Sequence, residues 1–426
     1  MLGIALGGGG TKGSYQLGAW LAFRELNINF DVVTGVSIGS LNAFMMIEDD
    51  FEKCNHLWNN VEVTNIIKDG FDIEEFNLVE IMKHNDFKPF VKKYFKDKGA
   101  DIVPFKQMVW SYADFNKIKN SEKKYGVILS SFPMRRKEEV YMNTLSDGDM
   151  FNALIASCSL FPIFPTAQFN NKQYIDGGYS DNLPIEFNFR LGSTKVVAID
   201  LDDKITHKEY LNNPYVTYIY PKWDLGSCLY FNKDVINRNK LLGYYDTLKA
   251  FNKYEGFKYT FNIDENYLNL AKIITLNILN DSIYINNNNL RKPRSKSIIT
   301  FMNEHINRKI NDYDYFLKAI ENLGEIYDIN PCINYNTNEF INIIFEEINK
   351  EKDLILIEEL PLIKSEGRKK EYINNYDKKK FVNFLYNNKF DFDFKIFLLQ
   401  NNFSLYIALI FFESVGKTNE IQLHSK

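Results

Sequence analysis

The chain contains few of the residues on which metal centres, disulfides and histidine-based active sites depend. Its 426 residues include four cysteines and five histidines. No two cysteines form a C-x-x-C pair, so the sequence supports neither a zinc knuckle nor a redox motif. We expect reduced thiols, most of them buried, in an intracellular protein. The cysteines are Cys54, Cys158, Cys228 and Cys332.

Strong charge of one sign and long apolar runs are also lacking. The formal net charge of -4 is small for this length and argues against a nucleic-acid protein held by a large positive field. No apolar run is long enough for a membrane span, and we expect the longest, residues 405–412, to be a buried helix. Residues 1–6 lead directly into a glycine-rich loop and leave no room for a signal peptide. We therefore expect a cytoplasmic protein that contacts membranes only transiently and at their surface.

The first part of the chain alternates short apolar strands with amphipathic helices. Helical spacing is present in residues 14–26 and 38–46. Strands are predicted at residues 3–6, 31–34, 125–130, 195–201 and 216–220. Such alternation is typical of a mainly parallel sheet that is covered by helices on both faces. The sequence therefore predicts an α/β domain over residues 1–255.

The composition changes after about residue 251. Glycine and small residues become rare, and asparagine, lysine, isoleucine and tyrosine dominate, with helical spacing in residues 340–349 and 379–387. We expect a mainly helical C-terminal domain over residues 256–426, whose role the sequence does not indicate. The basic stretch 291–296 either touches phosphate head groups or forms a solvated loop.

A glycine-rich loop follows the first predicted strand. Gly8-x-Gly10-x-x-Gly13 matches the dinucleotide fingerprint, but the acid expected at the end of the next strand is missing, because Asp31 stands at its start. A phosphate-binding P-loop is disfavoured because Lys12 precedes the last glycine. We favour an oxyanion hole built from the N–H groups of Gly8, Gly9 and Gly10. A nucleotide loop or a structural turn remain the alternatives, and Lys12 either orients the loop, meets an anionic head group or is solvated.

A serine stands on a tight turn between the second predicted strand and an apolar helix. The segment Gly35-Val36-Ser37-Ile38-Gly39 fits the nucleophile elbow, in which small flanking residues relieve crowding and expose the hydroxyl. Serine is also a good helix N-cap, so a purely structural role is the alternative. We predict Ser37 as the nucleophile.

A serine nucleophile needs a base, and the best candidate is a carboxylate. Asp176 ends a predicted strand at residues 173–175 and is followed by Gly177 and Gly178, which allow another loop to approach. A tight hairpin turn is the structural alternative, and Asp181 is the competing acid. His207 would complete a Ser–Asp–His order, but it lies in a charged segment typical of a protein surface.

These segments resemble the patatin-like phospholipase family, and the resemblance covers about residues 1–255. Its G-G-G-x-[KR]-G, G-x-S-x-G and D-G-[GA] motifs match in order and without substitution, at Gly8–Gly13, Gly35–Gly39 and Asp176–Gly178. The resemblance implies a three-layer α/β/α fold, a Ser37–Asp176 dyad and hydrolysis of lipid acyl esters without a metal or organic cofactor. The motif residues that would support the dyad are Lys12, Gly13, Gly35, Gly39, Gly177 and Gly178.

The expected function is thus a serine lipid acyl hydrolase of the phospholipase A or lysophospholipase type. Its partner would be a membrane phospholipid or lysophospholipid. Transfer of the acyl group from the same acyl-serine to an alcohol is one alternative. A lipase effector regulated by the C-terminal domain is another, and a nucleotide-binding oxidoreductase is a distant one.

Overall fold

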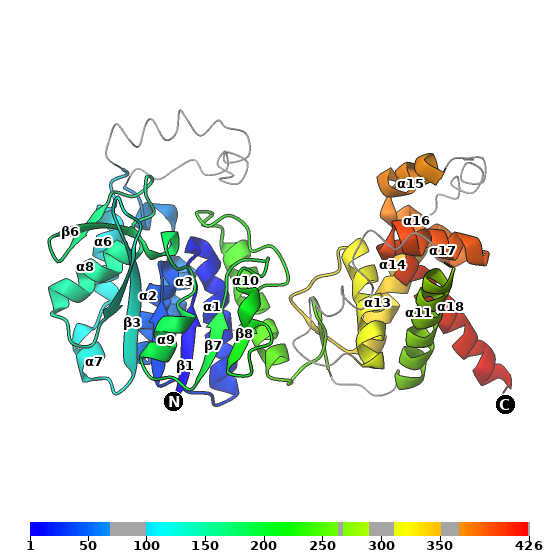
Figure 1. Ribbon diagram of the computed structural model, residues 1–426, viewed down its shortest axis with the longest axis horizontal. Helices are drawn as coiled ribbons and strands as arrows, with labels where there is room; N and C mark the ends of the chain where they lie inside the picture. Colours follow the sequence, from blue (N-terminus) through cyan, green and yellow to red (C-terminus); the bar gives the residue numbers. More distant parts are fainter. Residues whose placement is uncertain (69–98, 263–266, 289–310, 351–365, 425–426) are drawn as a thin grey trace. The chain divides into compact units, whose positions relative to one another are not determined.

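The computed structural model divides the chain into two compact units, Met1–Asn252 and Lys253–Lys426 (Figure 1). It describes residues 1–68, 99–262, 267–288, 311–350 and 366–424. The two units are described separately below.

The first unit is built on one mixed, mostly parallel sheet with strand order β5-β6-β3-β2-β1-β7-β8, and β4 pairs with β3 beside this path. Strands β1, β2, β3, β7 and β8 are parallel, whereas β4, β5 and β6 join as antiparallel strands at one side. The strands are β1 (Leu2–Leu6), β2 (Val32–Gly35), β3 (Lys124–Ser131), β4 (Lys137–Tyr141), β5 (Ala167–Phe169), β6 (Lys172–Asp176), β7 (Lys195–Ile199) and β8 (Val216–Ile219). All six strands predicted above are confirmed, residues 173–175 within β6 among them, while β4 and β5 were not predicted.

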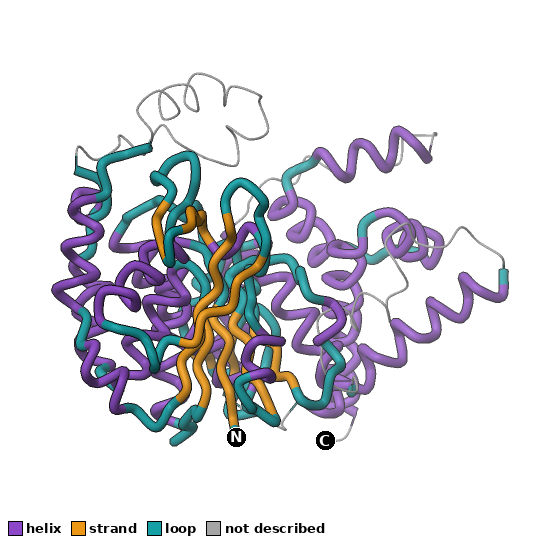
Figure 2. Tube along the Cα trace, turned by 60° about the vertical axis from the view of Figure 1, so that its left-hand side comes forward, coloured by secondary structure: helices purple, strands orange, loops and turns teal. Residues whose placement is uncertain are grey.

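Helices cover both faces of this sheet, which confirms the predicted layers. Neighbouring residues of β3 point in opposite directions. The Tyr125 hydroxyl donates to the Ser40 carbonyl of α2 (Ile38–Glu48) at 2.6 Å, whereas a Cβ at Gly126 would lie 2.4 Å from the Phe187 ring of α9 (Ile185–Arg190). Helices α2 and α9 therefore lie on opposite faces, and Figure 2 shows the strands between the helical layers of this unit.

The helices of the first unit begin at caps that the sequence supplies. Asp50, Asp114, Ser146 and Asn232 each accept a backbone N–H from the first turn of the helix that follows. The α-helices are α1 (Ser14–Glu25), α2 (Ile38–Glu48), α3 (Phe51–Asn60), α6 (Val103–Tyr112), α7 (Phe115–Asn120), α8 (Asp147–Ser157), α9 (Ile185–Arg190) and α10 (Lys233–Ala250). Short 3-10 turns are η1 (Gly10–Gly13), η2 (Val63–Asn65), η4 (Gly177–Tyr179) and η5 (Lys208–Tyr210).

The second unit is largely helical, as the change in composition predicted. Its helices are α11 (Leu268–Asn287), α13 (Asp312–Ile326), α14 (Thr337–Lys350), α15 (Glu366–Asn375), α16 (Lys378–Asn387), α17 (Phe392–Asn401) and α18 (Phe403–His424). Two short strands, β9 (Thr260–Phe261) and β10 (Asn334–Tyr335), pair in parallel. The basic stretch 291–296 lies outside the described residues.

The core of the second unit explains the apolar run near the end of the sequence. Residues 405–411 are buried in α18, so the prediction of a buried helix is confirmed. Glu321 is also fully buried, and one of its carboxylate oxygens accepts the N–H groups of Phe257, Lys258 and Tyr259 at 2.6–3.0 Å. These bonds satisfy a turn that would otherwise leave three donors unpaired. Within the described ranges, no helix combines the length and apolar character needed to cross a bilayer.

Candidate active site

The glycine loop turns sharply at the carboxyl end of β1 because its residues lack side chains. Gly10 has a φ of +57°, and a Cβ there would lie 1.9 Å from the carbonyl oxygen of Cys228. A Cβ at Gly9 would lie 2.9 Å from Leu201 Cδ1, and one at Gly13 would lie 2.5 Å from Ile38 Cγ1. Gly10 must therefore be glycine, whereas a side chain at Gly9 or Gly13 would displace the side chain of Leu201 or Ile38.

The hydrogen bonds of the loop change the predicted set of oxyanion donors. The Gly8 N–H already donates to the Asn182 carbonyl at 3.2 Å, so the structure does not leave it free. The N–H groups of Gly9 and Gly10 donate no hydrogen bond to any described residue. Ile38 is the first residue of α2, where a backbone N–H has no acceptor within the helix. The amides open to an oxyanion are thus those of Gly9, Gly10 and Ile38, and the sequence analysis did not include Ile38.

Ser37 lies on a strained turn between β2 and α2. Its φ of +52° and ψ of −129° are unusual for a residue with a side chain. A Cβ at Gly35 would lie 2.3 Å from the Gly39 carbonyl, and one at Gly39 would lie 2.3 Å from the Leu6 carbonyl. The flanking glycines therefore permit the turn. The Ser37 hydroxyl makes no capping bond to α2, which disfavours the purely structural role.

Asp176 ends β6 and is 4% exposed. Its Oδ1 accepts the Gly178 N–H at 2.8 Å, whereas its buried Oδ2 accepts no hydrogen bond among the described residues. Burial raises the pKa of Asp176 to about 6, and the nearby Ser37 hydroxyl and the Gly178 N–H oppose the rise. A carboxylate in this state is poised to take a proton near neutral pH.

The glycines after this acid allow the close packing that the sequence predicted. A Cβ at Gly177 would lie 2.2 Å from the Ile128 carbonyl, and one at Gly178 would lie 3.1 Å from Asp176 Oδ1. The competing acid, Asp181, faces elsewhere: its Oδ2 lies 3.1 Å from Lys137 Nζ, and its Oδ1 accepts the Leu183 N–H. Asp181 does not line the pocket described next.

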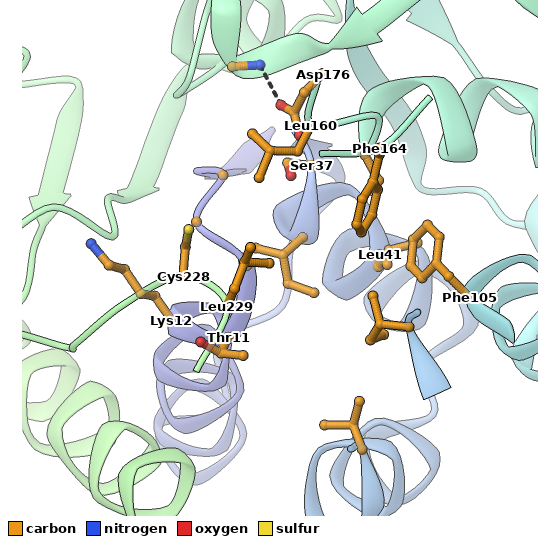
Figure 3. Close-up of a pocket in the computed structure, with 18 of the residues that line it drawn as sticks. Thr11, Lys12, Ser37, Leu41, Phe105, Leu160, Phe164, Asp176, Cys228 and Leu229 are labelled. Carbon is orange, nitrogen blue, oxygen red and sulfur yellow. Dashed lines mark hydrogen bonds between the residues drawn. The ribbon is translucent and has the colours of Figure 1, made fainter. Parts of the chain in front are cut away.

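Ser37 and Asp176 lie in one pocket of about 460 Å³ in the first unit (Figure 3). One end carries the glycine loop, Lys12, Asn182 and Asp202 also line the pocket, and most of the remaining wall is apolar. In Figure 3, Ser37 lies beside Asp176, while Leu41, Phe105 and Phe164 line the wall beyond them. Further apolar lining comes from Leu57, Trp58, Val61, Ile66, Met108, Leu160, Leu229 and Phe231. This shape suits a long apolar chain whose polar end reaches Ser37.

No described histidine takes part in this site. His207 Nδ1 lies 3.3 Å from Glu209, and His56 Nδ1 lies 3.0 Å from the Tyr112 hydroxyl. Neither ring lines the pocket. His84 and His305 lie outside the described residues. The Ser–Asp–His alternative therefore has no support from His207.

Lys12 lines the pocket rim, and its Nζ lies 3.7 Å from a carboxylate oxygen of Asp202. Figure 3 shows its side chain directed away from Ser37. The dinucleotide alternative gains nothing from this arrangement, because most of the pocket lining is apolar rather than built to hold ribose or phosphate.

Three polar residues that the sequence analysis did not single out hold the glycine loop. Gln16 Nε2 donates to the Gly7 carbonyl at 2.8 Å, and Asn42 Nδ2 donates both to the Gly13 carbonyl and to Gln16 Oε1. Asn182 Nδ2 donates to the Gly8 carbonyl at 3.3 Å. Gln16 and Asn42 are buried, so their unpaired amides would be costly and the loop is fixed at both ends. A single sequence carries no signal that distinguishes Gln16 and Asn42 from other polar residues on helices.

Known proteins resemble the first unit. Residues 4–188 match the family model described as patatin-like phospholipase. Lysophospholipase NTE1 of Meyerozyma guilliermondii is 26% identical over 200 residues, which cover 47% of this chain and 12% of that protein. Patatin-like phospholipase domain-containing protein 7 of Rattus norvegicus is 23% identical over 209 residues, which cover 48% of this chain and 14% of that protein. The chain thus spans only a small part of the length of these curated relatives.

Among solved structures, VipD from Legionella pneumophila aligns with 82% of this chain and 86% of its own, with a TM-score of 0.39 and 14% identity.

Proposed function

Because residues 4–188 belong to the patatin-like phospholipase family, we propose that this chain is a serine acyl hydrolase that cleaves fatty-acyl esters of phospholipids or lysophospholipids. One observation carries the proposal. A serine on a strained elbow and a buried carboxylate with an oxygen that has no hydrogen-bond partner among the described residues share a pocket whose wall is mostly apolar.

In the acylation step, Ser37 Oγ attacks the carbonyl carbon of the ester and Asp176 takes the hydroxyl proton. The carbonyl oxygen becomes an oxyanion, which accepts hydrogen bonds from the amides of Gly9, Gly10 and Ile38. The tetrahedral species then breaks the bond to the alcohol oxygen, which leaves with the proton from Asp176. Each oxyanion donor contributes about 10²–10³ to the rate, and general-base catalysis contributes about 10²–10⁴.

In the deacylation step, a water molecule loses a proton to Asp176 and attacks the acyl-serine. The second tetrahedral species releases the fatty acid, and Ser37 Oγ regains the proton. Asp176 thus serves as base and acid in both halves of the cycle, which suits a carboxyl group whose pKa is about 6.

Ser37→Ala tests the proposal directly. The purified chain is incubated with phospholipid and lysophospholipid, and the fatty acid released is measured. We expect Ser37→Ala to lose at least about 10³-fold in rate, while Ser121→Ala, in the loop between α7 and β3, keeps its activity. Substantial hydrolysis by Ser37→Ala would refute the assignment. If an added alcohol receives more acyl group than water does, the chain is an acyltransferase that uses the same acyl-serine.

A further inference from the structure

The loop between β3 and β4 exposes an apolar side chain and basic side chains together. We call residues 132–136 the hairpin tip. Met134 is 64% exposed, among the most exposed large apolar side chains of the described chain, and Arg135 and Arg136 beside it are exposed as well. An isolated exposed methionine has no consequence by itself, but two exposed arginines directly follow Met134.

The hairpin tip lies at the same edge of the sheet as Ser37. Strands β2 and β3 are parallel, with Gly35 opposite Val127, so both chains leave the sheet at its carboxyl edge. The Arg135 guanidinium lies 5.4 Å from the ring centre of Tyr179, which lines the pocket. Phe132 packs on Phe161 with ring centres 5.2 Å apart, and the Tyr179 hydroxyl donates to the Phe161 carbonyl. The tip is therefore attached to the rim of the pocket.

Among the described residues, no acid forms an ion pair with the two arginines of the tip. Lys137, the next residue, pairs with Asp181 and Glu139. By contrast, Arg135 and Arg136 form no ion pair with any described residue. Guanidinium groups bind phosphate through paired N–H donors, and the methionine that precedes the two arginines can enter the apolar layer below. This combination complements a lipid surface that carries negative phosphate groups.

We propose that the hairpin tip docks onto an anionic phospholipid bilayer, with Arg135 and Arg136 on phosphate groups and Met134 inserted at the interface. The inference rests on the proposed function in one respect, because it takes the pocket beside the tip as the lipid site. Docking at this edge brings the pocket entrance to the lipid surface, so that a lipid can enter without crossing bulk water.

Binding to vesicles tests this proposal apart from catalysis. The full chain carrying Ser37→Ala is mixed with two kinds of vesicle. One contains phosphatidylcholine alone, and the other contains phosphatidylcholine with about 30% phosphatidylserine, which gives a clearly negative surface. We expect binding to the anionic vesicles that weakens with added salt. Arg135→Gln/Arg136→Gln should weaken it about 30-fold, and Met134→Ser about tenfold.

A matched control removes the same charge at the opposite edge of the sheet. Arg24 lies in the last turn of α1, and Lys195 begins β7. Arg24→Gln/Lys195→Gln should bind the vesicles like the parent. If the parent does not bind anionic vesicles, or if the tip variants bind as well as the control, the docking proposal is wrong. Fatty acid release from lysophospholipid micelles by the chain with Ser37 intact reports separately on the proposed function.

Discussion

Gly8 and Asn182 exchange two hydrogen bonds that join the glycine loop to the segment after Asp176. The Gly8 N–H donates to the Asn182 carbonyl at 3.2 Å, and Asn182 Nδ2 donates to the Gly8 carbonyl at 3.3 Å. The Asn182 side chain also fills the space beside Gly178, where a Cβ would lie 2.7 Å from Asn182 Oδ1. One side chain therefore sets the distance between the proposed oxyanion hole and the proposed base.

Asn182→Ala should lower kcat by about 10- to 100-fold, because it releases the glycine loop and small misplacements of reacting groups are costly. The loss in unfolding free energy should be only about 1 kcal/mol, the value of one hydrogen bond. Steady-state kinetics measures the change in kcat, and urea denaturation measures the change in unfolding free energy. Asn401→Ala removes a similar bond, from Nδ2 to the Phe397 carbonyl in α17, and should leave kcat unchanged. Equal losses of kcat in both variants would contradict the positioning role.

Gly8→Ala should inactivate the protein while leaving it folded. The added Cβ would lie 2.6 Å from Asn182 Oδ1 and 3.1 Å from Ser37 Cβ, so the side chains at the site must move. We expect at least about a 100-fold loss in kcat, measured on a lipid ester.

Gly148→Ala is the matched glycine substitution. It lies in the first turn of α8, and a Cβ there meets no atom within 4 Å. This variant should retain full activity and unfold at a higher temperature, with a gain of about 0.5–1 kcal/mol. Retained activity in Gly8→Ala would show that the loop tolerates a side chain beside Ser37.

The pH dependence of kcat/KM should report the ionisation of Asp176. Only the carboxylate form can take the Ser37 proton, and burial raises the pKa of this group to about 6. Activity should therefore be constant above about pH 7 and fall tenfold per pH unit well below pH 6. A profile of kcat/KM against pH, recorded with a substrate that is stable in acid, measures this decrease. A midpoint near pH 4 would mean that the functional base is a solvent-exposed carboxylate.

Asp176→Asn should abolish activity and stabilise the fold at neutral and alkaline pH. The pKa of Asp176 is about 6 in the folded chain against 3.8 for an ordinary aspartate, so the folded state binds the proton more tightly. The penalty for burying the charge is complete above pH 6 and disappears below about pH 4. The uncharged asparagine side chain avoids this penalty. The unfolding free energy of the variant should therefore rise by up to about 3 kcal/mol at pH 8 and by little at pH 4.

Asp181→Asn provides the comparison for that experiment. It removes a partly exposed ion pair with Lys137, so it should change stability little and keep activity. Urea unfolding at both pH values, together with fatty acid release, separates the two carboxylates. An inactive Asp181→Asn beside an active Asp176→Asn would reverse their assignment.

The local pattern of the sequence was sufficient to predict the strands and helices that carry the motifs. Apolar runs and helical spacing predicted β1, β2, β3, β7 and β8, because buried parallel strands need continuous apolar side chains. The β4 strand escaped prediction because it carries Lys137, Glu138 and Glu139 and is only partly buried. Its pairing with β3 depends on the neighbouring strand rather than on its own composition.

By itself, the sequence determined which residues can turn sharply and which can react. Glycine at positions 10, 35, 39 and 177 is required by close backbone approaches, and such positions are visible as a spacing along the chain. Only the tertiary structure decided that the Gly8 amide is already occupied, that Asp181 turns to Lys137, and that Asn182 joins the two loops. Hydrogen-bond partners, burial and the resulting pKa depend on groups far apart in sequence, and these come together only when the chain folds.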